Sequence, residues 1–251
     1  MVWFVGAGSG APDLITLRGQ KRLAEADVII YAGSLVNPEL LAFAKPDCKI
    51  FDSAKMTLEE VIEVITKADA QGKNTVRLHT GDPSLYGAIR EQMDILDTHG
   101  IKYEVVPGVS SFSSAAATLC AEYTLPGVSQ SLILTRMAGR TPVPEGESIE
   151  HLAKAGCSMA IFLSSGMLGK LQEKLLLGAY TQDTPCAIVY KASWPDEKVM
   201  HCTLGTLARC GKENGISKTA LVLVGKFLGN EYERSRLYDP TFMTGFRQAE
   251  L

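Results

Sequence analysis

Short apolar runs alternate with helical patterns along the first half of the chain. Each run is rich in β-branched or aromatic residues and is bounded by Gly, Pro, Asp or Ser, which predicts strands at residues 2–5, 28–31, 48–51, 75–79 and 103–106. Thr57 and Glu60 form a capping-box pattern that predicts a helix ending at Gly72, and a further helix is predicted at 84–98. Strands that alternate with helices predict a mostly parallel sheet covered on both faces.

The second half of the chain changes character. Its apolar runs predict strands at residues 131–135, 158–163, 186–191, 199–203 and 220–224, and helices are predicted around 149–155, 168–177 and 204–214. The turn residues at 194–197 are typical of a hairpin, so a mixed or antiparallel sheet fits best. We place the boundary in 121–130. The fold class is therefore α/β, with an N-terminal α/β domain at 1–120 and a C-terminal α/β domain at 121–251. The charged, aperiodic end of the chain, from Gly229, is expected on the surface or against a partner.

Composition narrows the function. The 251 residues carry 25 Lys and Arg against 28 Asp and Glu, for a net charge of −3, and 46% of them are hydrophobic. This excludes a disordered chain and argues against a protein that binds nucleic acid through bulk positive charge. No apolar run approaches the ~18–20 residues that span a bilayer. The six cysteines are dispersed without a C-x-x-C pair, and residues 2–5 resemble a first strand rather than a signal peptide. A cytoplasmic protein without a metal is the expectation.

A glycine-rich loop follows the first predicted strand. Gly6, Gly8 and Ala11 formally satisfy the dinucleotide-binding pattern. In that pattern the helix opens directly after the glycines, whereas here Pro12-Asp13 intervenes and the helix is predicted to start near Thr16. An acid for the ribose is also missing after the second strand. The glycines form a tight turn, or they let the backbone approach a ligand closely.

Two more loops follow predicted strands of the first half. Gly81 and Asp82 come directly after the strand at 75–79, and Pro83 suits a sharp turn into a helix. Asp82 fits a helix cap, or a ligand site at the carboxyl end of a parallel strand. The loop at 107–111 makes the same turn after the next strand, and its hydroxyl groups and free amides suit a carboxylate or a ribose. Three such loops in one half favour a ligand site.

These motifs resemble a known family. The segments VGAGSGAPDLITLRG, GDPSLYG and PGVSSFSSAAA, in this order and spacing, are similar to those of the tetrapyrrole methyltransferases. The resemblance extends to TALVLVG near the end, and YAGSLVNPELL and LTRMAGRTPVPEGE most resemble the precorrin-4 C11-methyltransferases of corrin (cobalamin) biosynthesis. It implies a fold of two α/β domains with a cofactor cleft between them, S-adenosyl-methionine as methyl donor, S-adenosyl-homocysteine as product, a tetrapyrrole substrate and a homodimer.

The resemblance also implies site residues. Carried over motif by motif, the expected donor-binding residues are Ser9, Thr80, Gly81, Asp82, Leu85, Ser110, Ser111, Leu163, Ser164, Ala192, Thr219 and Ala220. The candidates for contacts with the substrate are Gly8, Ser34, Arg136, Met137 and Arg140. Arg136 and Arg140 suit the substrate's carboxylates, which need local positive charge on an acidic protein. They are equally compatible with ordinary surface arginines, and Met137 with a core residue.

Other functions stay open at this stage. Relatives that methylate uroporphyrinogen carry an Asp where this chain has Ala32, which favours a later corrin-pathway substrate and methylation of C11 on precorrin-4 or its cobalt complex. The rivals are methylation at C17 or C20, methylation of diphthine or ribosomal RNA, a dinucleotide-dependent oxidoreductase, and a tetrapyrrole carrier without transfer. Methyl transfer needs alignment and exclusion of water rather than a conspicuous nucleophile. No residue identifies itself as catalytic.

Overall fold

The computed structural model describes residues 1–248 and divides the chain into two compact units. The first unit comprises Met1–Ser114 together with Lys191–Asp196. The second comprises Ala115–Tyr190 and the chain from Glu197 onward. Each unit contains one five-stranded sheet, so the prediction of two α/β domains is confirmed.

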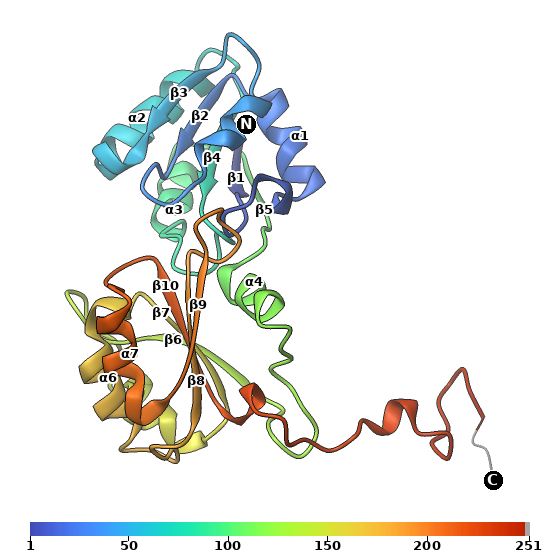
Figure 1. Ribbon diagram of the computed structural model, residues 1–251. Helices are drawn as coiled ribbons and strands as arrows, with labels where there is room; N and C mark the ends of the chain where they lie inside the picture. Colours follow the sequence, from blue (N-terminus) through green and yellow to red (C-terminus); the bar gives the residue numbers. More distant parts are fainter. Residues whose placement is uncertain (249–251) are drawn as a thin grey trace. The chain divides into compact units, whose positions relative to one another are not determined.

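The sheet of the first unit is entirely parallel (Figure 1). Its strand order is β3-β2-β4-β1-β5. The strands are β1 (Val2–Gly6), β2 (Val28–Tyr31), β3 (Lys49–Asp52), β4 (Thr75–His79) and β5 (Tyr103–Val106). All five were expected from the apolar runs, with ends that agree to within one residue. In a parallel sheet the carboxyl ends of all strands lie at one edge, so the loops after β1, β4 and β5 are brought together.

Helices cover both faces of this sheet because alternate residues of β1 point to opposite sides. Trp3 and Val5 pack with Leu23 of α1 (Leu17–Glu25). Val2 and Phe4 pack on the other face with residues of α2 (Leu58–Asp69) and α3 (Arg90–Thr98). Burial on both faces explains why β1 is a continuous apolar run rather than an alternating one.

The helix boundaries test the capping patterns. The capping box at α2 is confirmed, since Glu60 N donates to Thr57 Oγ1 at 3.3 Å and Thr57 N donates to Glu60 Oε2 at 2.7 Å. The predicted start of the next helix at Ser84 is wrong, because α3 begins at Arg90. Tyr86 and Ala88 have φ values of 57° and 49°, which a right-handed helix does not allow.

The sheet of the second unit is mixed, as predicted. Its order is β6-β7-β10-β8-β9, in which β6 and β7 are parallel and the other neighbours are antiparallel. The strands are β6 (Leu132–Arg136), β7 (Ser158–Phe162), β8 (Pro185–Tyr190), β9 (Lys198–Thr203) and β10 (Ala220–Val224).

The helices of the second unit are short. They are α5 (Ile149–Leu152), α6 (Leu168–Leu175) and α7 (Leu207–Glu213), while α4 (Ser111–Thr118) begins in the first unit and ends in the second. Ile149, Leu171 and Leu207 pack with Ile161 and Val222 in one apolar core. The three later helices therefore share one face of the sheet, where Figure 1 shows α6 and α7 side by side.

The chain beyond β10 carries several exposed apolar side chains. After Gly229 it continues as an extended segment with one 3-10 turn at Arg236–Tyr238, in which Tyr238 is exposed, as is Phe246 further on. Across residues 1–248, no helix has the length and apolar character needed to cross a bilayer.

Candidate active site

Three glycine-bearing loops meet at the carboxyl edge of the parallel sheet. We define them as the first loop (residues 6–13), the second loop (residues 80–87) and the third loop (residues 107–111). Gly8 and Gly81 form an isolated antiparallel bridge, in which Gly81 N donates to Gly8 O at 2.8 Å and Gly8 N donates to Gly81 O at 3.3 Å. Both residues have positive φ values, 81° and 61°, which glycine adopts without strain. The first two loops are thus joined through their backbones.

Two further glycines allow the third loop to join them. A Cβ atom on Gly6 would lie 2.6 Å from both Gly108 Cα and Gly81 O. A Cβ atom on Gly108 would lie 2.2 Å from Gly81 O. No side chain fits at either position, because the obstructing atoms belong to the backbone. The glycines make close packing of three loops possible, and they do more than form one turn.

Asp82 connects the second loop to the third. Its Oδ2 accepts a hydrogen bond from Gly108 N at 2.9 Å, and its Oδ1 accepts from Ser84 N at 2.9 Å and from the Ser84 hydroxyl. Partial burial raises the pKa of the Asp82 carboxyl, but the hydrogen bonds from Ser84 and Gly108 outweigh it, so the net pKa is below the usual value. The carboxylate is therefore charged at neutral pH. It also does more than cap a turn, because one of its oxygens reaches another loop.

We expect Asp82→Asn to weaken binding of S-adenosyl-homocysteine about tenfold. The NH₂ group of asparagine would face the backbone N–H of either Gly108 or Ser84, and the lost hydrogen bond costs about 1–3 kcal/mol. Isothermal titration calorimetry measures the affinity. Asp239→Asn is the matched control, because Asp239 accepts from Thr241 N and Oγ1, two residues further on, in the same way. Equal behaviour of the two variants would reduce Asp82 to a turn cap.

Ser9 lies at a buried junction of the first unit. Its hydroxyl is 2.6 Å from Ser114 Oγ and 2.8 Å from Ser193 Oγ, and its carbonyl accepts from Trp194 Nε1 at 3.0 Å. Gly10 packs against the same indole, since a Cβ atom there would lie 2.1 Å from Trp194 Cδ1. The stretch Lys191–Asp196 therefore supports the first loop. Sequence reasoning assigned residues 194–197 to a hairpin turn and Ala192 to the donor site, and it missed the contacts that Ser193 and Trp194 make with the first loop.

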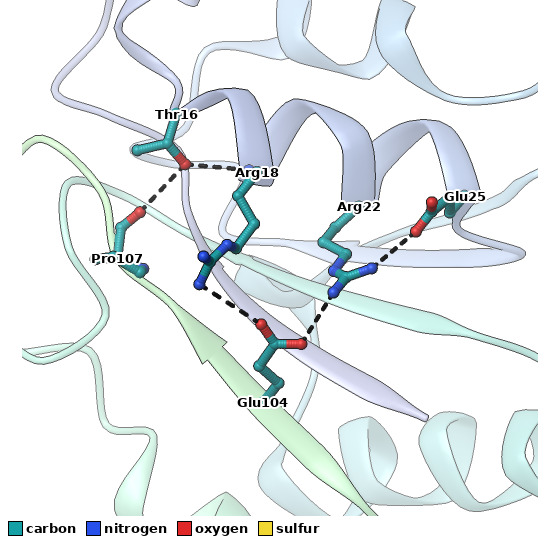
Figure 2. A network of polar contacts seen from close by, with 7 residues as sticks. Thr16, Arg18, Arg22, Glu25, Glu104 and Pro107 are labelled. Atoms are coloured by element: carbon teal, nitrogen blue, oxygen red, sulfur yellow. Dashed lines mark hydrogen bonds and ion pairs between the residues drawn. The ribbon is translucent and has the colours of Figure 1, made fainter.

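A polar network joins α1 to β5 and the third loop (Figure 2). Arg22 donates to Glu25 at 3.0 Å and to Glu104 at 3.1 Å, and its guanidinium carbon lies 4.6 Å from the centre of the Trp3 ring. Thr16 caps α1, with its Oγ1 accepting from Gly19 N and donating to Pro107 O at 3.4 Å. The network places the amino end of α1 next to the third loop.

We expect Glu104→Gln to lower the free energy of unfolding by about 1 kcal/mol, because Arg22 and Arg18 lose a common carboxylate in a partly buried setting. Urea denaturation measures the change. The control is Glu63→Gln, which removes a more exposed pair with Lys67 and should change stability by no more than a few tenths of a kcal/mol. Equal effects would place the Glu104 pair among the ordinary surface ion pairs.

The candidate residues of the second unit gather at one edge of the mixed sheet. β6 and β7 are parallel, and Ala220 pairs with Tyr190 at the antiparallel junction of β10 and β8. The residues that follow β7 and precede β10, Leu163 and Thr219, both have positive φ values, 51° and 55°. Such backbone is strained for residues other than glycine and concentrates at functional sites.

Ser164 is fully buried at this edge. Its hydroxyl donates to Phe162 O at 2.7 Å and accepts from Met137 N at 2.9 Å, so it fastens the end of β7 to the end of β6. Leu163 beside it is 65% exposed and is the more accessible of the two candidates. Ala192, which follows β8, is buried and belongs to the first unit.

Arg136 and Arg140, the two arginines suggested for the substrate's carboxylates, lie in different surroundings. The Arg136 guanidinium donates to the carbonyl oxygens of Met137, Thr141 and Pro142 at 3.3, 3.2 and 2.7 Å, so it orders the loop after β6. Met137 is 4% exposed and packs in the core of the second unit. Arg140 is exposed on the same loop. Arg140 is accordingly the better placed of the two arginines to meet an anion.

The remaining candidates lie on the loops of the first unit. Thr80 and Ser111 are partly buried, Ser110 is 6% exposed, and a Cβ atom on Gly81 would meet Ser110 Cα at 3.5 Å. Leu85 N donates to Asp82 O at 3.2 Å within the second loop. Ser34 is exposed in the turn after β2 and is not joined to the other candidates by any contact described here. Over residues 1–248, no three His, Cys, Asp or Glu side chains gather as metal ligands.

Comparison of the sequence with models of known families shows which family the chain belongs to. The model of the tetrapyrrole (corrin/porphyrin) methylases matches residues 1–208. The chain belongs to this family. A cobalt-precorrin-4 C(11)-methyltransferase of Methanocaldococcus jannaschii is 53% identical over 249 residues, which cover 99% of this chain and 96% of the relative.

Solved structures of tetrapyrrole methylases agree. The X-ray structure of a cobalt precorrin-4 methyltransferase matches with a TM-score of 0.89 and 46% identity, over 91% of this chain and 96% of the other. A uroporphyrin-III C-methyltransferase from Thermus thermophilus, complexed with S-adenosyl homocysteine, matches with a TM-score of 0.76 and 27% identity, over 90% and 98% of the two chains.

The geometry of this methylase also bears on the oxidoreductase hypothesis. The first loop continues into a 3-10 turn at Pro12–Leu14, and α1 begins only at Leu17, after the cap Thr16. Its helix therefore does not open directly after the glycines, as a dinucleotide site requires. β2 itself ends without an acid, and Asp52 of β3, which pairs with Tyr31, accepts from Gly33 N through its Oδ1 at 3.1 Å.

Proposed function

We propose that this chain is an S-adenosyl-methionine-dependent C-methyltransferase that methylates C11 of precorrin-4 or cobalt-precorrin-4 in corrin biosynthesis. The observation that carries the proposal is the similarity, over nearly the whole chain, to a relative named for this reaction. The interlocked loops of the first unit support it, because they contain most of the residues expected to bind the donor.

The residues present fit such a donor. Glycines at positions 6, 8, 81 and 108 let backbone amides and carbonyls of three loops approach closely. Asp82 adds a charged carboxylate tied to Gly108. Ser110 and Thr80 add hydroxyl groups beside Gly81. We propose the second and third loops, which include Leu85 and Ser111, as the core of the donor site, with Ser9 of the first loop beside them.

The chemistry asks little of the side chains. S-adenosyl-methionine, when bound, supplies a methyl group that is already activated by the positive charge on its sulfur. The residues of the loops then bind and orient the reactants and exclude water. The strained ends at Leu163 and Thr219 present backbone at the edge of the second sheet and are proposed to bind the donor with Ser164, Ala192 and Ala220.

The substrate of this reaction carries several carboxylates. We propose Arg140 as a contact for them, since it is exposed while Arg136 is bound to backbone carbonyls. Arg136 then acts by shaping the loop that carries Arg140. Gly8 and Ser34 remain the proposed contacts on the first unit.

The decisive test is a transfer assay. The purified protein is incubated with S-adenosyl-methionine and either precorrin-4 or cobalt-precorrin-4, and the product is analysed by mass spectrometry and NMR. We expect one added methyl group at C11. A methyl group at C17 or C20 would move the enzyme to another step, and no transfer to either ring would overturn the proposal. The relative rates on the two rings assign the cobalt-free or cobalt-bound route.

The proposal includes a homodimer that works in the cytoplasm. Both features come from the resemblance of the sequence to the family. Light scattering after size-exclusion chromatography measures the mass of the particle, and a monomeric mass would contradict the dimer.

A further inference from the structure

A line of buried polar side chains runs from β4 to the turn that ends the second loop. Arg77, in the middle of β4, is 7% exposed, and Gln92 of α3 is 5% exposed. Arg77 Nε donates to Gln92 Oε1 at 3.1 Å, and Arg77 Nη1 donates to Ile30 O at 3.1 Å. Gln92 Nε2 donates in turn to Ala88 O at 3.0 Å. The side chains thus connect the centre of the sheet to the backbone at Ala88.

The backbone at the end of this line is strained. Tyr86 and Ala88 both have positive φ values, 57° and 49°. Gly87 between them packs against the carbonyl of Pro83, where a Cβ atom would lie 2.2 Å from the oxygen. A strained backbone persists only where its surroundings fix it. The hydrogen bond from Gln92 to Ala88 is a contact that fixes this turn.

Arg77 determines which way the Gln92 amide faces. A guanidinium group has only donors, so the amide oxygen must face Arg77 and the NH₂ group must face Ala88 O. The positive charge of the Arg77 guanidinium also polarises the Gln92 amide, which strengthens the hydrogen bond from Gln92 Nε2 to Ala88 O. No ion pair with a carboxylate is found for Arg77 among residues 1–248.

Burying Arg77 and Gln92 in the core costs more free energy than burying apolar residues of the same size would. A buried cation without a counter-charge destabilises a protein, and an apolar residue of the same size would pack at lower cost. Burial lowers the pKa of Arg77 to about 10, so the group remains charged at neutral pH. The two polar residues are therefore best explained by what they orient, and what they orient is the turn at residues 86–88.

We propose that Arg77 and Gln92 are positioning residues for the second loop, which they hold in its donor-binding form through Ala88 O. The inference rests on the proposed function, since it takes the second loop to bind the methyl donor. It assigns a role to two buried residues that need not touch the donor.

The variant Gln92→Glu separates positioning from packing. Glutamate keeps an acceptor for Arg77 and gives that cation a counter-charge, but as a carboxylate it cannot donate to Ala88 O. We expect the Kd for S-adenosyl-homocysteine, measured by calorimetry, to rise about tenfold, the usual scale for one lost hydrogen bond in a binding site. The melting temperature should stay within a few degrees of the wild type, because the buried cation is now paired.

Gln172→Glu is the matched control. Gln172 Nε2 donates to Gly205 O at 3.2 Å and its Oε1 accepts from Ala208 N at 2.9 Å, in the second unit. Glutamate there also keeps the acceptor and loses the donor, and the Kd should not change. If Gln92→Glu does not fold, Gln92→Met removes both hydrogen bonds without adding a charge and is expected to show the same loss of affinity.

The outcomes are distinguishable. A wild-type protein that binds no S-adenosyl-homocysteine overturns the proposed function, and this inference with it. A wild-type protein that binds, with an unchanged Kd in the Gln92 variant, overturns the inference alone. Equal weakening by the Gln92 and Gln172 variants also overturns it, because the effect would then be a general loss of stability.

Discussion

Gly108→Ala is expected to weaken binding of S-adenosyl-homocysteine by about a hundredfold. The new Cβ atom would lie 2.2 Å from Gly81 O and 2.7 Å from Gly6 Cα. Both are backbone atoms, so no side-chain rotation can relieve the clash, and the three loops must move apart. Overpacking of this kind costs about 3 kcal/mol. When this cost falls on the donor-binding arrangement of the loops, it corresponds to a roughly hundredfold loss of affinity. Calorimetric titration of the variant measures the loss.

Gly146→Ala is the control for this substitution. Gly146 lies in the 3-10 turn Glu145–Glu147 of the second unit, and a Cβ atom there meets nothing within 4 Å. We expect unchanged affinity and a change in stability of at most about 1 kcal/mol. A Gly108→Ala protein that binds as tightly as the wild type would show that the junction of the loops is not part of the donor site.

The strands of the first unit could be predicted because their signal is local. β4 and β5 were placed with the correct ends, since both runs are short, contain β-branched or aromatic residues and are bounded by turn residues. The start of α3 could not be predicted. Leu85 and Ile89 continue the apolar period of the helix, but Tyr86 and Ala88 have positive φ values, and the Gln92 side chain that binds Ala88 O is oriented by Arg77 of β4. Local propensity does not contain that information.

The candidate site shows the same limit. The sequence indicated the glycine loops, because glycine has a conformational meaning of its own. It did not indicate Ser193 and Trp194, which reach the first loop from a point about 180 residues later in the chain. Nor did it indicate that the Arg136 guanidinium binds backbone carbonyls. A turn motif such as Trp194-Pro195-Asp196 reveals how the chain bends, and the fold decides what the bend contacts.

Stability should fall as the pH is lowered from 7 to 5, and His79 should account for most of the fall. His79 is 5% exposed at the end of β4, and its Nε2 is buried without a hydrogen-bond partner in the described structure. Burial, with a smaller contribution from the nearby charge of Arg77, lowers the pKa of His79 to about 3. The ring is therefore neutral in the folded protein at pH 5.

The sign follows from proton uptake. In the unfolded chain His79 titrates near pH 6.5, so below that pH the unfolded state binds a proton that the folded state does not. His79 therefore does not reduce the free energy of unfolding above about pH 6.5, and it reduces it progressively as the pH falls toward about 3. Between pH 7 and pH 5 the free energy of unfolding should drop by about 2 kcal/mol from this group alone. Carboxyl groups contribute little in this window because they titrate mainly below it.

His79→Phe tests this assignment. Phenylalanine suits a site where the His79 ring already lies 6.0 Å from the Phe4 ring, and it has no proton to bind. Urea denaturation of the variant should give a nearly flat free energy of unfolding between pH 5 and pH 7. His201→Gln, at an exposed position on β9, should keep the slope of the wild type. If His79→Phe keeps it as well, the folded ring binds protons near neutral pH and finds a partner for them. The loss of stability between pH 7 and pH 5 would then have to come from a group other than His79.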